Sequence, residues 1–81
     1  MVRLDQALSD LNQAVLLDSS FAFAYYYRAL VYRHKGETEK AIADNQKVIE
    51  LTKNDKDDRL HRTAQLELFF YFGVNKFGVN K

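Results

Sequence analysis

The sequence contains no cysteine and no proline, and it has only three glycines among 81 residues. Without cysteine the chain forms no disulfide and offers neither a thiolate nucleophile nor a cysteine-based zinc site. Proline and glycine are the residues that most often interrupt helices. Their scarcity therefore predicts a chain that is nearly all helix.

An excess of charge of one sign is also lacking, since the chain has 12 basic and 11 acidic residues and a formal net charge of +1. A chain with such balanced charge presents no strong positive field to nucleic acid. The longest apolar run, residues 68–72, is too short to span a bilayer, and the N-terminus lacks the apolar segment of a signal peptide. We therefore expect a cytoplasmic protein with no nucleic-acid partner and no stable membrane insertion.

Apolar residues recur at helical spacing along most of the chain, which predicts helices that each bury one face. Ser19 and Ser20 follow the first such stretch and offer side-chain oxygens that cap the second. Gly36 suits a left-handed exit from the second helix, and the acidic residues of the loop around 53–57 suit the positive N-terminal end of a fourth. Helices joined by short loops pack as antiparallel neighbours, so we expect an all-α fold with helices at about 3–18, 21–35, 38–52 and 57–72.

The chain also matches itself. A shift of 34 residues places Ala7 on Ala41 and Asp10 on Asp44, so the first predicted helix is aligned with the third. A self-match at this period indicates helical hairpins that stack in a row.

The residues from 24 to 42 carry the strongest pattern and resemble the tetratricopeptide repeat family. Tyr25 is the large residue that opens the first helix of the repeat, and Gly36 is its turn. Ala29 and Ala41 are the small residues that let the two helices approach closely. The resemblance implies antiparallel hairpins stacked as a right-handed α-solenoid, and a function in protein–protein interaction.

The chain departs from the family pattern in three ways. One is that it starts inside a repeat, so we expect the C-terminal end of a longer array or a truncated fragment. The other two concern single positions. Asn45 stands where the family usually has an aromatic ring, and Ser19 and Lys53 replace the proline that normally ends the second helix of a repeat. Both departures concern packing and helix ends, and neither changes the period.

The predicted organisation is one helical domain over residues 1–72, followed by a tail. Within the domain, residues 3–18 form the second helix of a partial repeat, 21–55 a full repeat and 57–72 a closing helix. The tail, residues 73–81, contains the segment Phe-Gly-Val-Asn-Lys directly after another copy of itself, and we expect it to be frayed.

By resemblance, the first helix of each hairpin lines the inner surface of the solenoid. The candidate groove residues of the second predicted helix are therefore Phe23, Tyr26, Tyr27, Leu30, Arg33 and His34. Tyrosine and arginine are common at binding hot spots because they combine contact area with a polar tip.

A second candidate surface lies on the fourth predicted helix. Leu60, Ala64, Leu68 and Phe72 form the inward stripe of a closing helix, whereas Leu66, Phe69 and Phe70 fall off that face. The solvent-exposed face of a terminal helix is normally polar. Three interpretations are open for this second stripe: self-association into a homo-oligomer, cover by the tail folding back, and contact with a membrane surface.

Nothing in the sequence specifies catalysis or a cofactor. His34 and His61 lie on different predicted helices and are expected at the surface, and Asp55, Asp57 and Asp58 lack the spacing and glycine of a calcium loop. The basic clamp with which some family members hold a C-terminal carboxylate is absent. The sequence thus predicts a non-catalytic module that binds a protein or peptide, without metal or cofactor, and a self-associating structural domain is the alternative.

Overall fold

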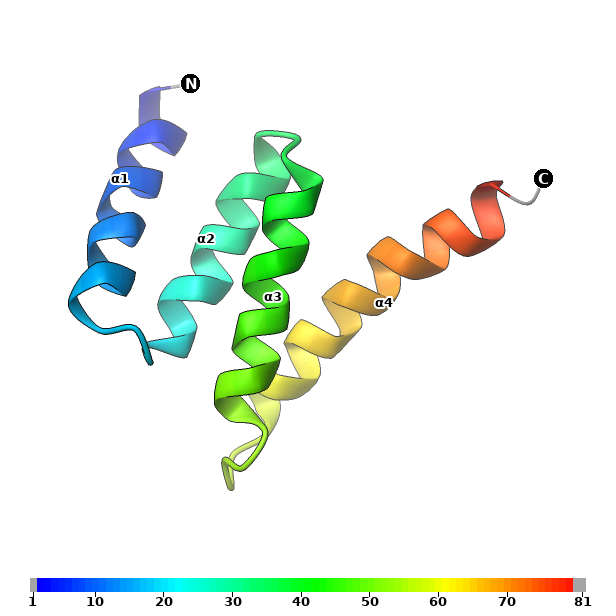
Figure 1. Cartoon of the computed structure of the whole chain (residues 1–81). Helices are drawn as coiled ribbons and strands as arrows, with labels where there is room; N and C mark the ends of the chain where they lie inside the picture. The colour runs from blue at the N-terminus through cyan, green and yellow to red at the C-terminus, as the bar shows by residue number, and fades with distance from the viewer. Residues whose placement is uncertain (1, 80–81) are drawn as a thin grey trace.

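The computed structural model describes the backbone of residues 2–79 and the side chains of residues 2–72. It contains four helices, α1 (Val2–Leu17), α2 (Ala22–His34), α3 (Thr38–Thr52) and α4 (Arg59–Val79). Helices α1, α2 and α3 lie side by side in Figure 1, and α4 leaves the end of α3 with its C-terminal half pointing away from the others. The predicted all-α fold of stacked hairpins is confirmed.

The helices form a flat row rather than a bundle, with extents of 43 × 37 × 15 Å. The main packing is between helices that follow one another in the chain, and it is most extensive between α2 and α3. Each helix therefore buries its apolar face against its sequence neighbours, as expected for a repeat fold. The outer helix α1 accordingly has no fully buried residue.

The core is built around small and medium side chains. Ala29 of α2 is 1% exposed and Ala41 of α3 is 0% exposed, so both predicted close-packing positions are buried. Tyr25, Val48 and Ala64 form the central cluster, which joins α2, α3 and α4. Small residues at a helix crossing allow the two helices of the hairpin to approach closely.

Asn45 lies in this core at 1% exposure, although the resemblance noted in the sequence led us to expect an aromatic ring at this position. Its side-chain carbonyl oxygen has no hydrogen-bond partner among the residues that the structure describes. A buried acceptor without a partner costs stability, so the departure noted in the sequence is a weak point of the packing.

The end of α2 is closed by a Schellman motif. The N–H of Gly36 donates to the carbonyl oxygen of Arg33 (3.0 Å), and the N–H of Glu37 donates to that of Tyr32 (2.8 Å). Gly36 adopts φ +79°, the left-handed conformation that the sequence predicted for this exit.

Replacing Gly36 by alanine is expected to lower the free energy of unfolding by about 1 kcal/mol, because a Cβ disfavours the left-handed conformation. No atom lies within 4 Å of the position that this Cβ would occupy, so the effect comes from the backbone alone. Urea unfolding followed by circular dichroism measures it. Gly36→Asn serves as the control and should lose less, since asparagine tolerates this conformation; equal stability of the alanine variant would contradict the assignment.

The start of α2 differs from the prediction. Its N-cap residue is Phe21, and no side-chain oxygen caps the helix. Ser20 precedes the N-cap position, and its own N–H donates to the carboxylate of Asp18 (3.0 Å). The carbonyl oxygen of Ser19 instead accepts a hydrogen bond from the hydroxyl of Tyr25 (3.1 Å), which ties the loop to the helix.

Helix α4 is longer than the sequence indicated. It begins at Arg59, directly after the acidic loop, and its backbone stays helical to Val79, beyond the predicted end at Phe72. The residues predicted as a frayed tail thus continue the helix, while residues 80 and 81 lie outside the described residues. Glycine lowers helix propensity by only about 1 kcal/mol, which does not by itself end a helix. Within the described range, no helix combines the length and apolarity that crossing a membrane requires.

Candidate protein-binding cleft

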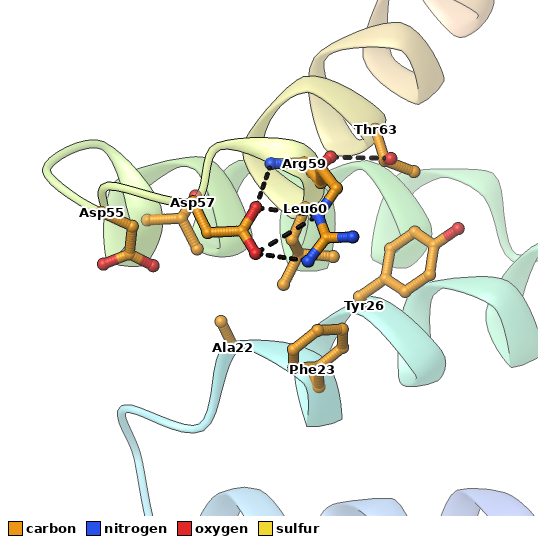
Figure 2. A pocket seen from close by; sticks show the side chains of 9 residues that line it. Ala22, Phe23, Tyr26, Asp55, Asp57, Arg59, Leu60 and Thr63 are labelled. Atoms are coloured by element: carbon orange, nitrogen blue, oxygen red, sulfur yellow. Dashed lines mark hydrogen bonds and ion pairs between the residues drawn. The ribbon is translucent and has the colours of Figure 1, made fainter.

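A cleft of about 590 Å³ separates the N-terminal half of α2 from the start of α4. Figure 2 shows the rings of Phe23 and Tyr26 on one side and the Asp57–Arg59 pair on the other. The complete lining is formed by Ala22, Phe23, Tyr26, Thr52, Asp55, Asp57, Arg59, Leu60 and Thr63. The loop between α3 and α4 and the antiparallel packing of the helices bring these residues together.

The α2 wall of the cleft is aromatic. The ring of Phe23 is 50% exposed, and the ring of Tyr27 stacks on it with centroids 6.2 Å apart. Tyr26 also contacts Tyr27, with ring centroids 5.6 Å apart. Because these residues follow one another at helical spacing, the helix holds their rings as one surface before any partner arrives.

The α4 wall carries an ion pair. The guanidinium of Arg59 donates to both carboxylate oxygens of Asp57, with distances of 3.0 and 2.7 Å for its closest contacts. The backbone N–H of Arg59 donates to the same carboxylate at 3.1 Å. These hydrogen bonds lower the pKa of Asp57 to about 2. Asp57 is therefore a carboxylate at neutral pH, and it marks the N-terminal end of α4 as the sequence predicted.

A second ion pair links α2 and α4 further along the two helices. The guanidinium of Arg33 donates to both oxygens of Glu67, at 3.0 and 3.2 Å. Burial raises the pKa of Tyr26 and of Tyr71, and the charge of Glu67 contributes to both shifts. This pair bridges the two helices and leaves Arg33 engaged within the chain.

The best-formed ion pair lies between α2 and α3, outside the cleft. Nε and Nη2 of Arg28 donate to the two carboxylate oxygens of Asp44, each at 2.8 Å, and Nη1 donates to Asn12 of α1 at 3.0 Å. The guanidinium also lies over the rings of Tyr25 (5.5 Å) and Tyr32 (5.8 Å). One arginine thus connects three helices, which is a structural role.

Two of the residues predicted for the groove line this cleft. Phe23 and Tyr26 line the cleft, while Tyr27 lies beside it at 50% exposure. Leu30 is half-buried, and His34 is exposed at the end of α2 and does not line the cleft.

The α4 wall was missed. Leu60 was predicted to face inward, but Asp57, Arg59 and Thr63 were not recognised as cleft residues. Glu67 follows Arg33 by 34 residues, the period of the repeat. This separation could have predicted the ion pair between Arg33 and Glu67, because equivalent positions of successive first helices lie side by side.

His61 was predicted to lie at the surface, and this prediction is wrong. It is half-buried, and its Nδ1 lies 2.9 Å from the hydroxyl oxygen of Thr52. That hydroxyl donates its proton to the carbonyl oxygen of Val48 at 2.7 Å. Nδ1 of His61 must therefore carry a proton and donate it to Thr52. Within the described part of the chain, no group of three or more histidine or acidic residues is placed to hold a metal ion.

The second stripe of α4 faces water. Leu66, Phe69 and Phe70 are 68, 69 and 60% exposed. Phe72, which the sequence placed on the inward stripe, is 49% exposed, because the C-terminal half of α4 diverges from the other helices (Figure 1). The tail continues α4 as a helix, so the fold-back interpretation is wrong for the backbone of residues 73–79.

Comparison with known proteins supports the repeat assignment. Residues 22–55 match the tetratricopeptide repeat family. Over 66 residues, or 82% of the chain, the sequence is 38% identical to DnaJ homolog subfamily C member 7 of Homo sapiens and 36% identical to that of Mus musculus. Over 60 residues, or 74% of the chain, it is 45% identical to DnaJ homolog subfamily C member 3 of Gallus gallus.

The chain spans only 13% of the length of the first two relatives and 12% of the third. No solved structure matches it. The family match supports a protein–protein interaction module.

Proposed function

Because residues 22–55 are a tetratricopeptide repeat, we propose that this chain is a non-catalytic module that binds a peptide segment of a partner protein in the cleft between α2 and α4. The observation that carries the proposal is the cleft itself, with the rings of Phe23 and Tyr26 open to it. Clefts that bind ligands combine an apolar lining with a few polar groups that fix orientation. This one has both.

The aromatic wall supplies the affinity. Phe23 is already half-exposed, so a partner that covers it removes apolar area from water without rearranging the protein. Covering the exposed half of a phenylalanine ring contributes about 2 kcal/mol, or an affinity change of roughly thirtyfold. Ordered rings also reduce the entropy lost on binding, because they are held by one another.

A second candidate function is self-association through Leu66, Phe69 and Phe70. The specific observation in its favour is that three large apolar side chains next to one another on α4 are more than half exposed. Contiguous apolar patches on soluble proteins often mark contact surfaces. The two candidates use different faces and make separate predictions.

Phe23→Ala is expected to weaken peptide binding at least tenfold, whereas Phe69→Ala leaves it within about twofold. The two variants are matched, since each truncates an exposed phenylalanine on a helix. Peptides are first selected from a random library displayed on phage with the unmodified chain as bait. Their affinity for each variant is then measured by fluorescence polarisation.

Light scattering across a concentration series completes the comparison. If α4 mediates self-association, the apparent mass rises with concentration for the unmodified chain and for Phe23→Ala, but not for Phe69→Ala. Equal loss of peptide binding in both variants would contradict the cleft assignment. A strict monomer at high concentration would remove the second candidate.

A further inference from the structure

The cleft is lined by three charged side chains, two of which form an ion pair with each other. Arg59 is engaged by Asp57 through its side chain and its backbone N–H, so these two charges cancel. Asp55 also lines the cleft, and its exposed carboxylate has no hydrogen-bond or ion-pair partner among the residues that the structure describes. Lys53 and Lys56 belong to the same loop, but they are exposed and do not line the cleft. The lining therefore carries one uncompensated negative charge.

The aromatic wall formed by α2 attracts positive charge, as the carboxylate of Asp55 does. The faces of aromatic rings bear negative potential, and a cation near them is stabilised. Phe23 and Tyr26 line the cleft from α2, and Figure 2 shows their rings opposite the Asp57–Arg59 pair, with Asp55 further along the loop. A basic side chain that enters the cleft thus finds aromatic rings and a free carboxylate in the same lining, with its aliphatic stem against the rings.

We propose that the cleft selects peptides that place an arginine or lysine next to an apolar side chain. The apolar residue contacts Phe23 and Leu60, and the basic head group pairs with Asp55 at the loop end of the cleft. An acidic peptide or a C-terminal carboxylate meets like charge in the same place. This inference rests on the proposed function, because it states which peptides the cleft holds.

The hydrogen bonds around Asp57 reinforce the selection. They lower the pKa of Asp57 to about 2, so Asp57 is a carboxylate at neutral pH and stays paired with Arg59. They also occupy Arg59, whose guanidinium would otherwise attract acidic partners. The ion pair between Arg33 and Glu67 leaves no free positive charge where it bridges the two helices.

The test compares three short capped peptides that differ at one position. Each carries the same apolar residue, followed by arginine, glutamine or glutamate, and binding is measured by fluorescence polarisation. An exposed ion pair is worth up to about 1 kcal/mol, so the arginine peptide is expected to bind roughly three- to fivefold more tightly than the glutamine peptide. The glutamate peptide should bind most weakly, and raising the salt concentration should reduce the differences.

Asp55→Asn removes the charge while it keeps the shape of the side chain, and it should make the arginine and glutamine peptides bind equally. Asp10→Asn, an exposed aspartate of α1 outside the cleft, is the control and should retain the preference. If all three peptides bind the unmodified chain equally, or if Asp55→Asn keeps the preference, the charge selection is overturned and the cleft assignment stands. If none of them binds, or if Phe23→Ala binds them as well as the unmodified chain does, both proposals are overturned.

Discussion

Replacing Arg28 by alanine is expected to lower the free energy of unfolding by about 3 kcal/mol or more, because it leaves the carboxylate of Asp44 buried without a partner. The side chain of Asp44 is only 7% exposed, and Arg28 supplies two hydrogen bonds to it at 2.8 Å. The same substitution removes the contact to Asn12 and the packing of the guanidinium over Tyr25. Single domains are stable by only about 5–15 kcal/mol, so the change brings this small domain close to unfolding.

Urea unfolding monitored by circular dichroism measures the loss, and Arg33→Ala provides the matched control. Arg33 also pairs with a carboxylate on a neighbouring helix, but its side chain is 40% exposed and that of Glu67 is 22% exposed. Exposed pairs contribute less than about 1 kcal/mol, so the control should unfold close to the unmodified chain. Similar losses in the two variants would show that burial of Asp44 does not determine the cost.

Removing both charges separates the cost of an unpaired charge from the value of the pair. When a buried ion pair is replaced by apolar residues of similar volume, stability is often unchanged or increased. Arg28→Met combined with Asp44→Leu should therefore recover most of the stability that Arg28→Ala loses. Failure to recover would mean that the hydrogen bond to Asn12 and the contacts with the tyrosine rings carry the stabilisation.

The fold was predictable because its determinants are local or periodic. The helical spacing of apolar residues set three of the four helices within a few residues, and the repeat of 34 residues set their stacking. Ala29 and Ala41 are buried as predicted, since a small residue at a helix crossing has few other roles. Gly36 is left-handed for an equally local reason, the absence of a Cβ.

The polar contacts were less predictable because they depend on how neighbouring helices are positioned. Asp44 matched Asp10 in the self-alignment, but only the packed hairpin shows that Arg28 reaches it. The ion pair between Asp57 and Arg59 depends on the loop conformation, which the spacing of apolar residues does not determine. The length of α4 was underestimated for another reason: the duplicated segment at the end of the chain was expected to fray, whereas its backbone stays helical to Val79.

These contacts explain how a thin layer of helices can present a stable cleft. The row is only 15 Å thick in its smallest extent, so the interior that it encloses is small. The ion pair of Arg28 and Asp44 holds α2 against α3 on one side, and that of Arg33 and Glu67 holds α2 near α4 on the other. Together with the buried cluster of Tyr25, Val48 and Ala64, these ion pairs connect α2 to α3 and α4, the helices that carry the cleft.

Ala41→Leu is expected to lower the free energy of unfolding by about 1–3 kcal/mol, because the larger side chain must force α2 and α3 apart. Ala41 is 0% exposed and lies at the start of α3, within the hairpin that contains the most extensive packing. Ala43→Leu is the matched control, since it makes the same change on the exposed side of the same helix. That control should change stability by no more than about 0.5 kcal/mol.

The substitution at Ala41 should also disturb the cleft, because α2 carries its aromatic wall. If α2 moves away from α3, the distance between Phe23 and the α4 wall changes, and peptide affinity should fall together with stability. Melting temperatures from circular dichroism and affinities from fluorescence polarisation check the two effects on the same samples. Unchanged melting of Ala41→Leu would mean that the helices do not rely on a small residue at this crossing, and the basis for aligning the chain with itself would be lost.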